Sequence, residues 1–147
     1  MKQINRSALL LYSCEQMFDV VNSVEDYPEF LPWCDGARVI SGDNCHVIAE
    51  ILVARSGVKR SFTTKNYLCR PDTIELHLVE GPFRMLSGNW SFSPLGNNGC
   101  RVEMQLAFDL DSTLAGTFLS KVFDQGANTL VDAFCDRADH IYGEVSD

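Results

Sequence analysis

Residues 101–110 read RVEMQLAFDL, and apolar side chains occupy every second position of this stretch. A strict period of two is typical of a β-strand that buries one face and exposes the other. After Asp111 the spacing of the apolar residues changes to three and four, and this helical pattern continues to Ile141. It predicts a helix over residues 113–142, about 45 Å long at 1.5 Å per residue. Because an apolar sheet face needs a cover, we expect this helix to lie against the strand.

The segments before residue 101 repeat the strand pattern. In three further segments, one row of side chains takes every second position: Val47 to Val53, Phe62 to Leu68, with Thr64 and Asn66 in the row, and Ile74 to Leu78. Short runs rich in Gly, Pro, Asn, Asp and Ser separate these segments, at residues 42–44, 56–57, 71–72 and 96–99. Turns this short join neighbouring strands, so we expect consecutive strands to pair antiparallel.

The N-terminal segment supplies the remaining elements. Residues 3–12 lack helix signals and predict a first strand, whereas Ser13 followed by Gln16 forms a capping box that predicts the start of a helix. The sequence therefore predicts one α+β domain over residues 1–147: an antiparallel sheet of about seven strands around a long C-terminal helix, with short helices after the first strand. Gly126 inside the long helix favours a close backbone approach or a slight bend at that point.

Composition limits the classes of function. The 147 residues suffice for a core that buries about 70% of the unfolded surface. The net charge of -8 argues against DNA as a partner and against broad binding to anionic surfaces. No apolar run approaches the roughly 20 residues of a membrane helix, so we expect a cytoplasmic location. Peripheral contact of the protein with the inner face of the membrane is compatible with this location. The six cysteines show no C-x-x-C spacing, and we expect reduced, mostly buried thiols.

The sequence carries no recognisable catalytic motif. A nucleophile elbow, a phosphate-binding loop, a dinucleotide fingerprint and an H-E-x-x-H pair are all missing. His46 and His77 fall on the polar sides of their strands near Glu50 and Glu75, where exposed pairs are a simpler interpretation than acid–base machinery. We therefore expect a non-enzymatic protein with no catalytic residues, no metal site and no required cofactor.

Charge is distributed unevenly along the chain. Residues 51–71 contain no acid but hold five of the twelve basic residues: Arg55, Lys59, Arg60, Lys65 and Arg70. These side chains could contact phosphates of RNA or lipid, or they could offset carboxylates across the sheet. Both interpretations stay open.

A pocket is indicated by residues 25–34, EDYPEFLPWC, and by two polar residues on a strand. Pro28 and Pro32 prevent this segment from forming one regular helix or a central strand. Thr64 and Asn66 share the inward row of their strand with apolar neighbours, and a ligand is one partner that buried polar groups can have. We expect a cavity between sheet and helix with the aromatic segment at its mouth, although the segment could simply plug the open end.

Three motifs resemble a known family. VEDYPEFLPWC at Val24 to Cys34, EGPF at Glu80 to Phe83 and GNWSF at Gly88 to Phe92, followed by a long C-terminal helix, resemble the coenzyme Q-binding START-like family over nearly the whole chain. The resemblance implies a helix-grip fold with a lipophilic cavity. Mitochondrial members of that family bind ubiquinone and support respiration. Its bacterial members include a ribosome association toxin that binds the large ribosomal subunit and blocks its joining to the small one.

The leading hypothesis is binding of a hydrophobic small molecule, an isoprenoid quinone such as ubiquinone, in support of respiration, with transient membrane contact. The alternative is a toxin that binds the large ribosomal subunit. The predicted cavity residues are Phe62, Thr64, Asn66, Leu76, Leu78, Trp90, Phe92, Met104, Phe108, Phe118 and Val122. The predicted rim or lid residues are Tyr27, Pro28, Phe30, Leu31, Trp33 and Phe83. The predicted phosphate or ribosome contacts are Arg55, Lys59, Arg60, Lys65 and Arg70.

Overall fold

The structure is a computed structural model that describes residues 2–55, 58–110 and 114–143, without the side chains of residues 55, 58, 110 and 114–124. One sheet contains seven strands in the order β1-β7-β6-β5-β4-β3-β2, and every neighbouring pair is antiparallel. The strands are β1 (Lys2–Leu10), β2 (Cys34–Gly42), β3 (His46–Arg55), β4 (Val58–Cys69), β5 (Thr73–Glu80), β6 (Phe83–Leu95) and β7 (Gly99–Leu110). The predicted antiparallel sheet is confirmed.

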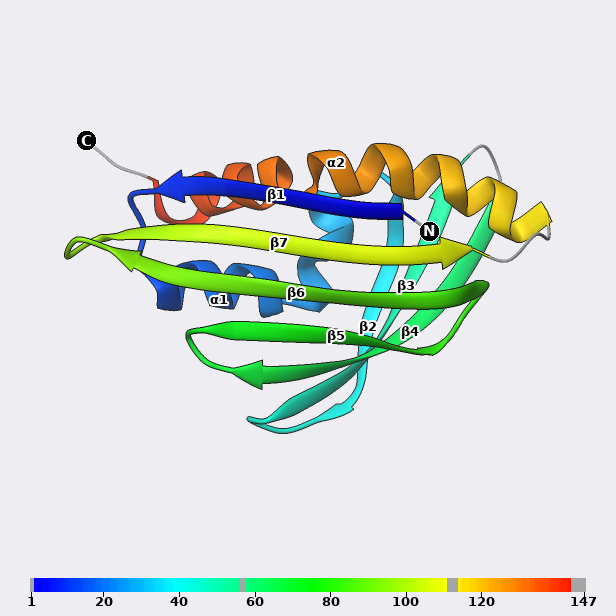
Figure 1. The fold of residues 1–147 in the computed structure, drawn as a ribbon, viewed down its shortest axis with the longest axis horizontal. Coiled ribbons are helices and arrows are strands. Elements are labelled where there is room, and N and C mark those ends of the chain that lie inside the picture. The colour runs from blue at the N-terminus through cyan, green and yellow to red at the C-terminus, as the bar shows by residue number, and fades with distance from the viewer. Residues whose placement is uncertain (1, 56–57, 111–113, 144–147) are drawn as a thin grey trace.

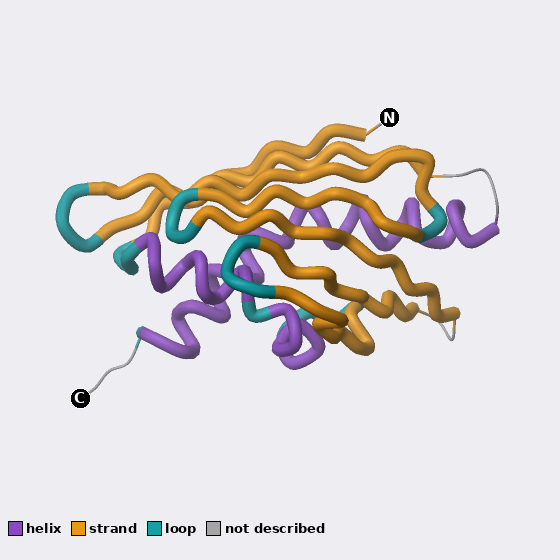
Figure 2. The backbone as a smooth tube through the Cα atoms, turned by 90° about the horizontal axis from the view of Figure 1, so that it is seen from below, coloured by secondary structure: helices purple, strands orange, loops and turns teal. Residues whose placement is uncertain are grey.

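The helices are α1 (Cys14–Asn22), the short 3-10 helix η1 (Val24–Glu29) and α2 (Leu114–Tyr142). Figure 2 shows them together on one side of the sheet, and Figure 1 shows α2 running along the strands from one end of the molecule to the other. The sheet therefore grips α2 with one face, as the change of period after Asp111 predicts. None of the described helices is long and apolar enough to cross a bilayer.

The alternating residues of β7 lie in the core. Val102, Met104, Leu106 and Phe108 are all buried, and in the register of the sheet Met104 lies opposite Trp90 of β6. Burying one face of the strand leaves its polar positions on the outer face of the sheet. The period of two thus decides which face receives the helices.

The start of α1 follows the predicted capping box. The Ser13 hydroxyl accepts a hydrogen bond from the Gln16 backbone N–H at 3.1 Å, and the Gln16 side-chain oxygen accepts one from the Ser13 N–H at 2.9 Å. The helix then buries Met17, Phe18 and Val21 against the sheet. Ser13 therefore fixes where the chain leaves β1 and turns onto the inner face.

The segment at residues 25–34 forms neither a regular α-helix nor a central strand. Pro28 lies inside η1, and the chain then turns through Leu31, whose N–H donates to the Tyr27 carbonyl at 2.9 Å. The Trp33 carbonyl accepts from the Ala54 N–H at 3.0 Å, at the start of β2. The aromatic segment is thereby anchored to the sheet at its C-terminal end.

All six cysteines are free thiols, as expected. Their burial is less uniform than predicted: Cys14, Cys34 and Cys100 are buried, whereas Cys45 and Cys69 are exposed. The two exposed thiols lie at a turn before β3 and at the end of β4, where the core does not reach.

Candidate functional site

A cavity of about 100 Å³ lies between the sheet and the helices. Four strands, α1, α2, η1 and the turn before β2 contribute to its wall, which is predominantly apolar. The lining residues are Val21, Asn22, Val24, Tyr27, Trp33, Ala49, Ile51, Phe62, Thr64, Asn66, Ile74, Leu76, Leu86, Trp90, Leu130 and Phe134. An apolar wall with few polar groups is typical of a site for a small hydrophobic ligand.

Five of the predicted cavity residues lie in this wall. They are Phe62, Thr64, Asn66, Leu76 and Trp90, from β4, β5 and β6. All five occupy the inward rows that the period of two indicates. Whether any of them contacts a ligand stays a prediction.

Four other predicted residues do not line the cavity. Phe92, Met104 and Phe108 are buried in the core, and Leu78 is only partly buried. Phe92 packs against Phe18 of α1, with ring centroids 5.6 Å apart, so α1 fills the space over that end of the sheet. Facing inward was therefore not sufficient, because a second helix covers part of the inner face. Phe118 and Val122 are also predicted cavity residues, but their side chains lie outside the described part of the structure.

The predicted rim residues divide into two groups. Tyr27 and Trp33 line the cavity, whereas Leu31 is a fully buried core residue and Pro28 is exposed. The Tyr27 hydroxyl donates a hydrogen bond to the Val21 carbonyl, and burial raises the pKa of this phenol. The hydroxyl proton of Tyr27 is therefore donated to the protein backbone.

Phe30 and Phe83 pack beside the cavity without lining it. Phe30 lies edge-on to Phe134 of α2 at 5.5 Å, and the Arg137 guanidinium lies 5.1 Å from the Phe30 ring centroid. Phe83 lies edge-on to Phe62 at 5.5 Å. Both rings support cavity residues from behind.

Trp33 meets α2 at Gly126. A Cβ atom at Gly126 would lie 2.8 Å from Trp33 Nε1, which is closer than real Cβ contacts allow. The close approach that the sequence indicates at Gly126 is confirmed, and its partner is the indole of the aromatic segment. Glycine at this position therefore lets the aromatic segment at residues 25–34 and α2 pack together beside the cavity.

Three polar side chains interrupt the apolar wall. Thr64 and Asn66 are each 6% exposed, and the Thr64 hydroxyl donates to Asn66 Oδ1 at 2.8 Å. Asn22, at the end of α1, was missed by sequence reasoning. It follows the buried Phe18 by one helical repeat of four residues, which was the available signal for an inward position.

The predicted basic residues lie at the end of β3, along β4 and directly after β4. Lys59 pairs with Asp35 at 2.9 Å, and Arg70 makes two hydrogen bonds of 2.9 Å to Asp19 of α1. Lys59 and Arg70 are separated by about 36 Å at the usual rise of a strand. The structure thus offsets part of this charge with nearby acids, and phosphate binding by these residues stays a prediction.

Lys65 lies on the outer face, with its ammonium 5.1 Å from the centroid of the Tyr67 ring, and Arg60 is exposed. Among the described residues, no carboxylate lies within ion-pair distance of either cation. The side chain of Arg55, the remaining predicted phosphate contact, lies outside the described part of the structure.

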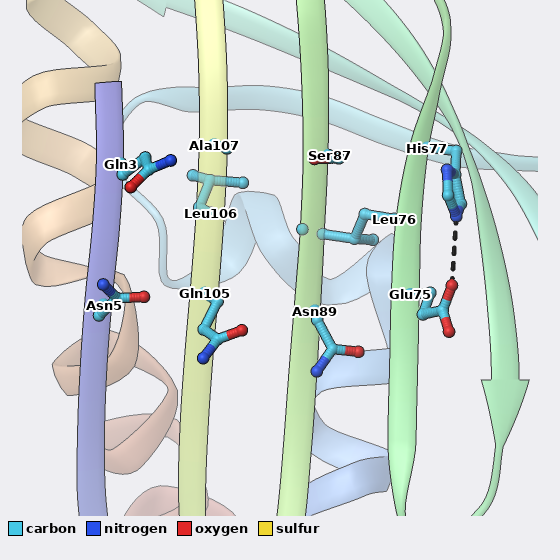
Figure 3. A pocket seen from close by; sticks show the side chains of 11 residues that line it. Gln3, Asn5, Glu75, Leu76, His77, Ser87, Asn89, Gln105, Leu106 and Ala107 are labelled. Carbon is cyan, nitrogen blue, oxygen red and sulfur yellow. Dashed lines mark hydrogen bonds and ion pairs between the residues drawn. The ribbon is translucent and has the colours of Figure 1, made fainter. Parts of the chain in front are cut away.

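A second hollow, of about 670 Å³, lies on the outer face of the sheet. Figure 3 shows carboxamide side chains from adjacent strands around it, and in the register Asn5, Gln105, Asn89 and Glu75 follow one another across β1, β7, β6 and β5. Its wall is polar, in contrast to the inner cavity. His77 contacts Glu75 at 3.3 Å in this hollow, and both side chains are more than half exposed.

His46 does not pair with Glu50 as expected. Its Nδ1 lies 3.4 Å from Asp43, while Glu50 binds Arg38 at 2.7 Å across β2 and β3. Within the described residues, no cluster of three or more His, Cys, Asp or Glu side chains could hold a metal ion.

The curved sheet, the long gripped helix and the apolar cavity between them define a helix-grip domain of the START-like class. The model of one family, polyketide cyclase/dehydrase and lipid transport, matches residues 10–135. The chain belongs to this family.

Two relatives with different names are similar to this chain over nearly its whole length. The ribosome association toxin RatA of Vibrio cholerae is 42% identical over 144 residues, which cover 98% of this chain and all of that protein. The mitochondrial coenzyme Q-binding protein COQ10 homolog B of Xenopus laevis is 31% identical over 151 aligned residues, 96% of this chain and 59% of that protein.

Solved structures support the same fold. An 18 kDa protein from Caulobacter crescentus has a TM-score of 0.74 and 32% identity, covering 98% of this chain and all of that one. The ZhuI aromatase/cyclase from Streptomyces has a TM-score of 0.80 at 14% identity, covering 94% and 93% of the two chains. At that low identity the likeness to the cyclase shows the fold alone.

Proposed function

We propose that this protein binds a hydrophobic molecule with a small polar head in the cavity between the sheet and α2, and that an isoprenoid quinone is this molecule. The observation that carries the proposal is the Thr64–Asn66 pair, two polar side chains buried in an otherwise apolar wall. Burying a polar group costs free energy unless the group is hydrogen-bonded, and a ligand head group can supply hydrogen bonds to Thr64 and Asn66. The coenzyme Q-binding relative supports the choice of a quinone.

The size of the cavity limits what it holds. At about 100 Å³ it is smaller than the roughly 150 Å³ cavity that accommodates benzene, so it has room for about one isoprenoid unit, and a quinone ring, which is larger than benzene, would have to widen it. A longer tail must extend beyond the described wall. Burying about ten tail carbons at roughly 0.8 kcal/mol each gives about 8 kcal/mol, an upper bound near micromolar affinity.

Two measurements test ligand binding. Mass spectrometry of an organic extract of the purified protein should identify an isoprenoid lipid. Titration of the delipidated protein with a short-chain quinone should quench the fluorescence of Trp33 and Trp90, which both line the cavity. If the extract contains no lipid, the quenching does not saturate and the quinone does not raise the thermal midpoint, the proposed ligand binding is wrong and the cavity is only a part of the packed core.

The second candidate function is association with the large ribosomal subunit, with inhibition of subunit joining. Its support is the name of the Vibrio cholerae relative, which is more similar to this chain than the coenzyme Q-binding relative is. Arg60 and Lys65 are the best placed cations for phosphate contact, since among the described side chains no acid pairs with them. We do not expect this function to require the inner cavity.

Co-sedimentation with large subunits tests this candidate. Binding should weaken as salt is raised, and the double change Arg60→Glu and Lys65→Glu should reduce it strongly and lower the logarithmic salt slope by roughly 0.7 to 0.9 per lost contact. Arg84→Glu, at an exposed position of β6, is the matched charge control. Wild-type protein that stays in the supernatant at low salt would exclude this candidate.

A further inference from the structure

The polar atoms of the cavity wall are not all paired. Asn22 Oδ1 is buried and has no hydrogen-bond partner among the described residues. Its side chain lines the same cavity as Thr64 and Asn66. An unpaired acceptor inside an apolar wall normally has a partner in the functional state of the protein.

Asn66 offers hydrogen-bond donors to the cavity, whereas Asn22 offers an acceptor. Its Oδ1 accepts the Thr64 hydroxyl at 2.8 Å, so the amide of Asn66 presents its N–H donors. The wall therefore offers one acceptor, from α1, and one donor group, from β4.

A ligand hydroxyl can pair with either atom, because it donates one hydrogen bond and accepts others. A quinone carbonyl, which only accepts, would leave Asn22 Oδ1 unpaired.

We propose that the cavity recognises a hydroxyl-bearing apolar molecule, which donates to Asn22 Oδ1 and accepts from Asn66 Nδ2, and that the reduced quinol is bound in preference to the quinone. This inference rests on the proposed ligand binding and specifies its chemistry. Asn22 is then a specificity-determining residue, and Asn66 contributes to binding of both redox forms. The Tyr27 hydroxyl does not replace Asn22, because its proton is donated to the Val21 carbonyl.

The test compares three probes on the same delipidated protein under anaerobic conditions: a short-chain quinone, its quinol, and the dimethyl ether of that quinol. Calorimetry gives the affinities without dependence on the optical properties of each probe. The quinol should bind about tenfold more tightly than the other two, because only it can donate a hydrogen bond to the buried acceptor.

The variant Asn22→Leu removes the acceptor at similar volume. It should bring the affinities for quinol and quinone within about twofold of each other, with the quinone affinity unchanged or increased. Asn66→Leu should weaken both ligands. Asn5→Leu, on the outer face of β1, is the matched control and should keep the wild-type preference for quinol.

The outcomes separate the two proposals. If none of the probes binds to folded wild-type protein, the proposed ligand binding fails. If all three bind with equal affinity, ligand binding stands and the hydroxyl preference is overturned. The comparison of probes on wild-type protein decides the question even if Asn22→Leu does not fold. A quinol preference that survives in folded Asn22→Leu would remove Asn22 from the explanation.

Discussion

Replacing Gly126 by alanine tests how tightly the aromatic segment packs on α2. The added Cβ would lie 2.8 Å from Trp33 Nε1 and 3.2 Å from Cδ1 and Cε2 of the same ring. Overpacking at a buried contact costs about 1 to 3 kcal/mol. Alanine also favours the helix by about 1 kcal/mol relative to glycine. The free energy of unfolding should therefore fall by up to about 2 kcal/mol, although an exposed helical glycine would show the opposite sign.

The Trp33→Ala background is the control for this prediction. Without the indole the clash disappears, and Gly126→Ala should then raise the free energy of unfolding by about 1 kcal/mol. The two changes should thus be coupled by about 1 to 3 kcal/mol in a double-mutant cycle. Urea unfolding followed by circular dichroism measures all four proteins. A gain of about 1 kcal/mol in both backgrounds would show that Trp33 does not press on the helix.

Three further outcomes are expected. Asn66→Leu alone should lower the free energy of unfolding by about 1 to 2 kcal/mol in urea unfolding, because the buried Thr64 hydroxyl loses its acceptor, and adding Thr64→Val should recover most of the loss. Arg137→Ala should lower the thermal midpoint by several degrees, because this side chain is mostly buried, contacts Glu29 at 3.1 Å and covers Phe30; an unchanged midpoint would mean that the contact is dispensable. Burial raises the pKa of the Cys100 thiol to about 12 and that of Cys135 to about 11, so at pH 8 an alkylating reagent should modify the exposed Cys45 and Cys69 first; mass spectrometry of early time points that finds Cys100 labelled would contradict this.

The regular elements were predictable because their signals are local. Ala49, Ile51 and Val53 occupy every second position of β3, and all three are buried. Ser13 and Gln16 predicted the start of α1 from four residues of sequence. Local signals of this kind require no knowledge of distant partners.

The cavity was only partly predictable because its extent depends on distant contacts. The inward row of β6 contains both Trp90 and Phe92, but α1 covers Phe92 and leaves Trp90 in the cavity wall. Gly126 indicated a close approach, yet no local pattern identifies Trp33 as the partner. Asn22 was overlooked because a single polar residue at a helix end is usually exposed.

The basic stretch shows the same limitation in electrostatics. Lys65 points outward from β4, whereas Arg70, which directly follows this strand, reaches Asp19 of α1. Acids that are remote in sequence then offset part of the charge. A run without acids therefore predicts a local excess of charge only when the strands on either side are also known.

The pairing of β1 with β7 affects how the protein must be synthesised. Residues 2–10 find their partners at residues 100–108, whereas β2 to β7 each pair with the next strand along the chain. A growing chain can therefore assemble the six-stranded meander one hairpin at a time, but its first strand must wait for the last. At roughly 5 to 20 residues per second, this delay is on the order of 5 to 20 s. During this delay, the apolar run from Ala8 to Leu11 has no strand to pair with, which makes it a natural client for a chaperone.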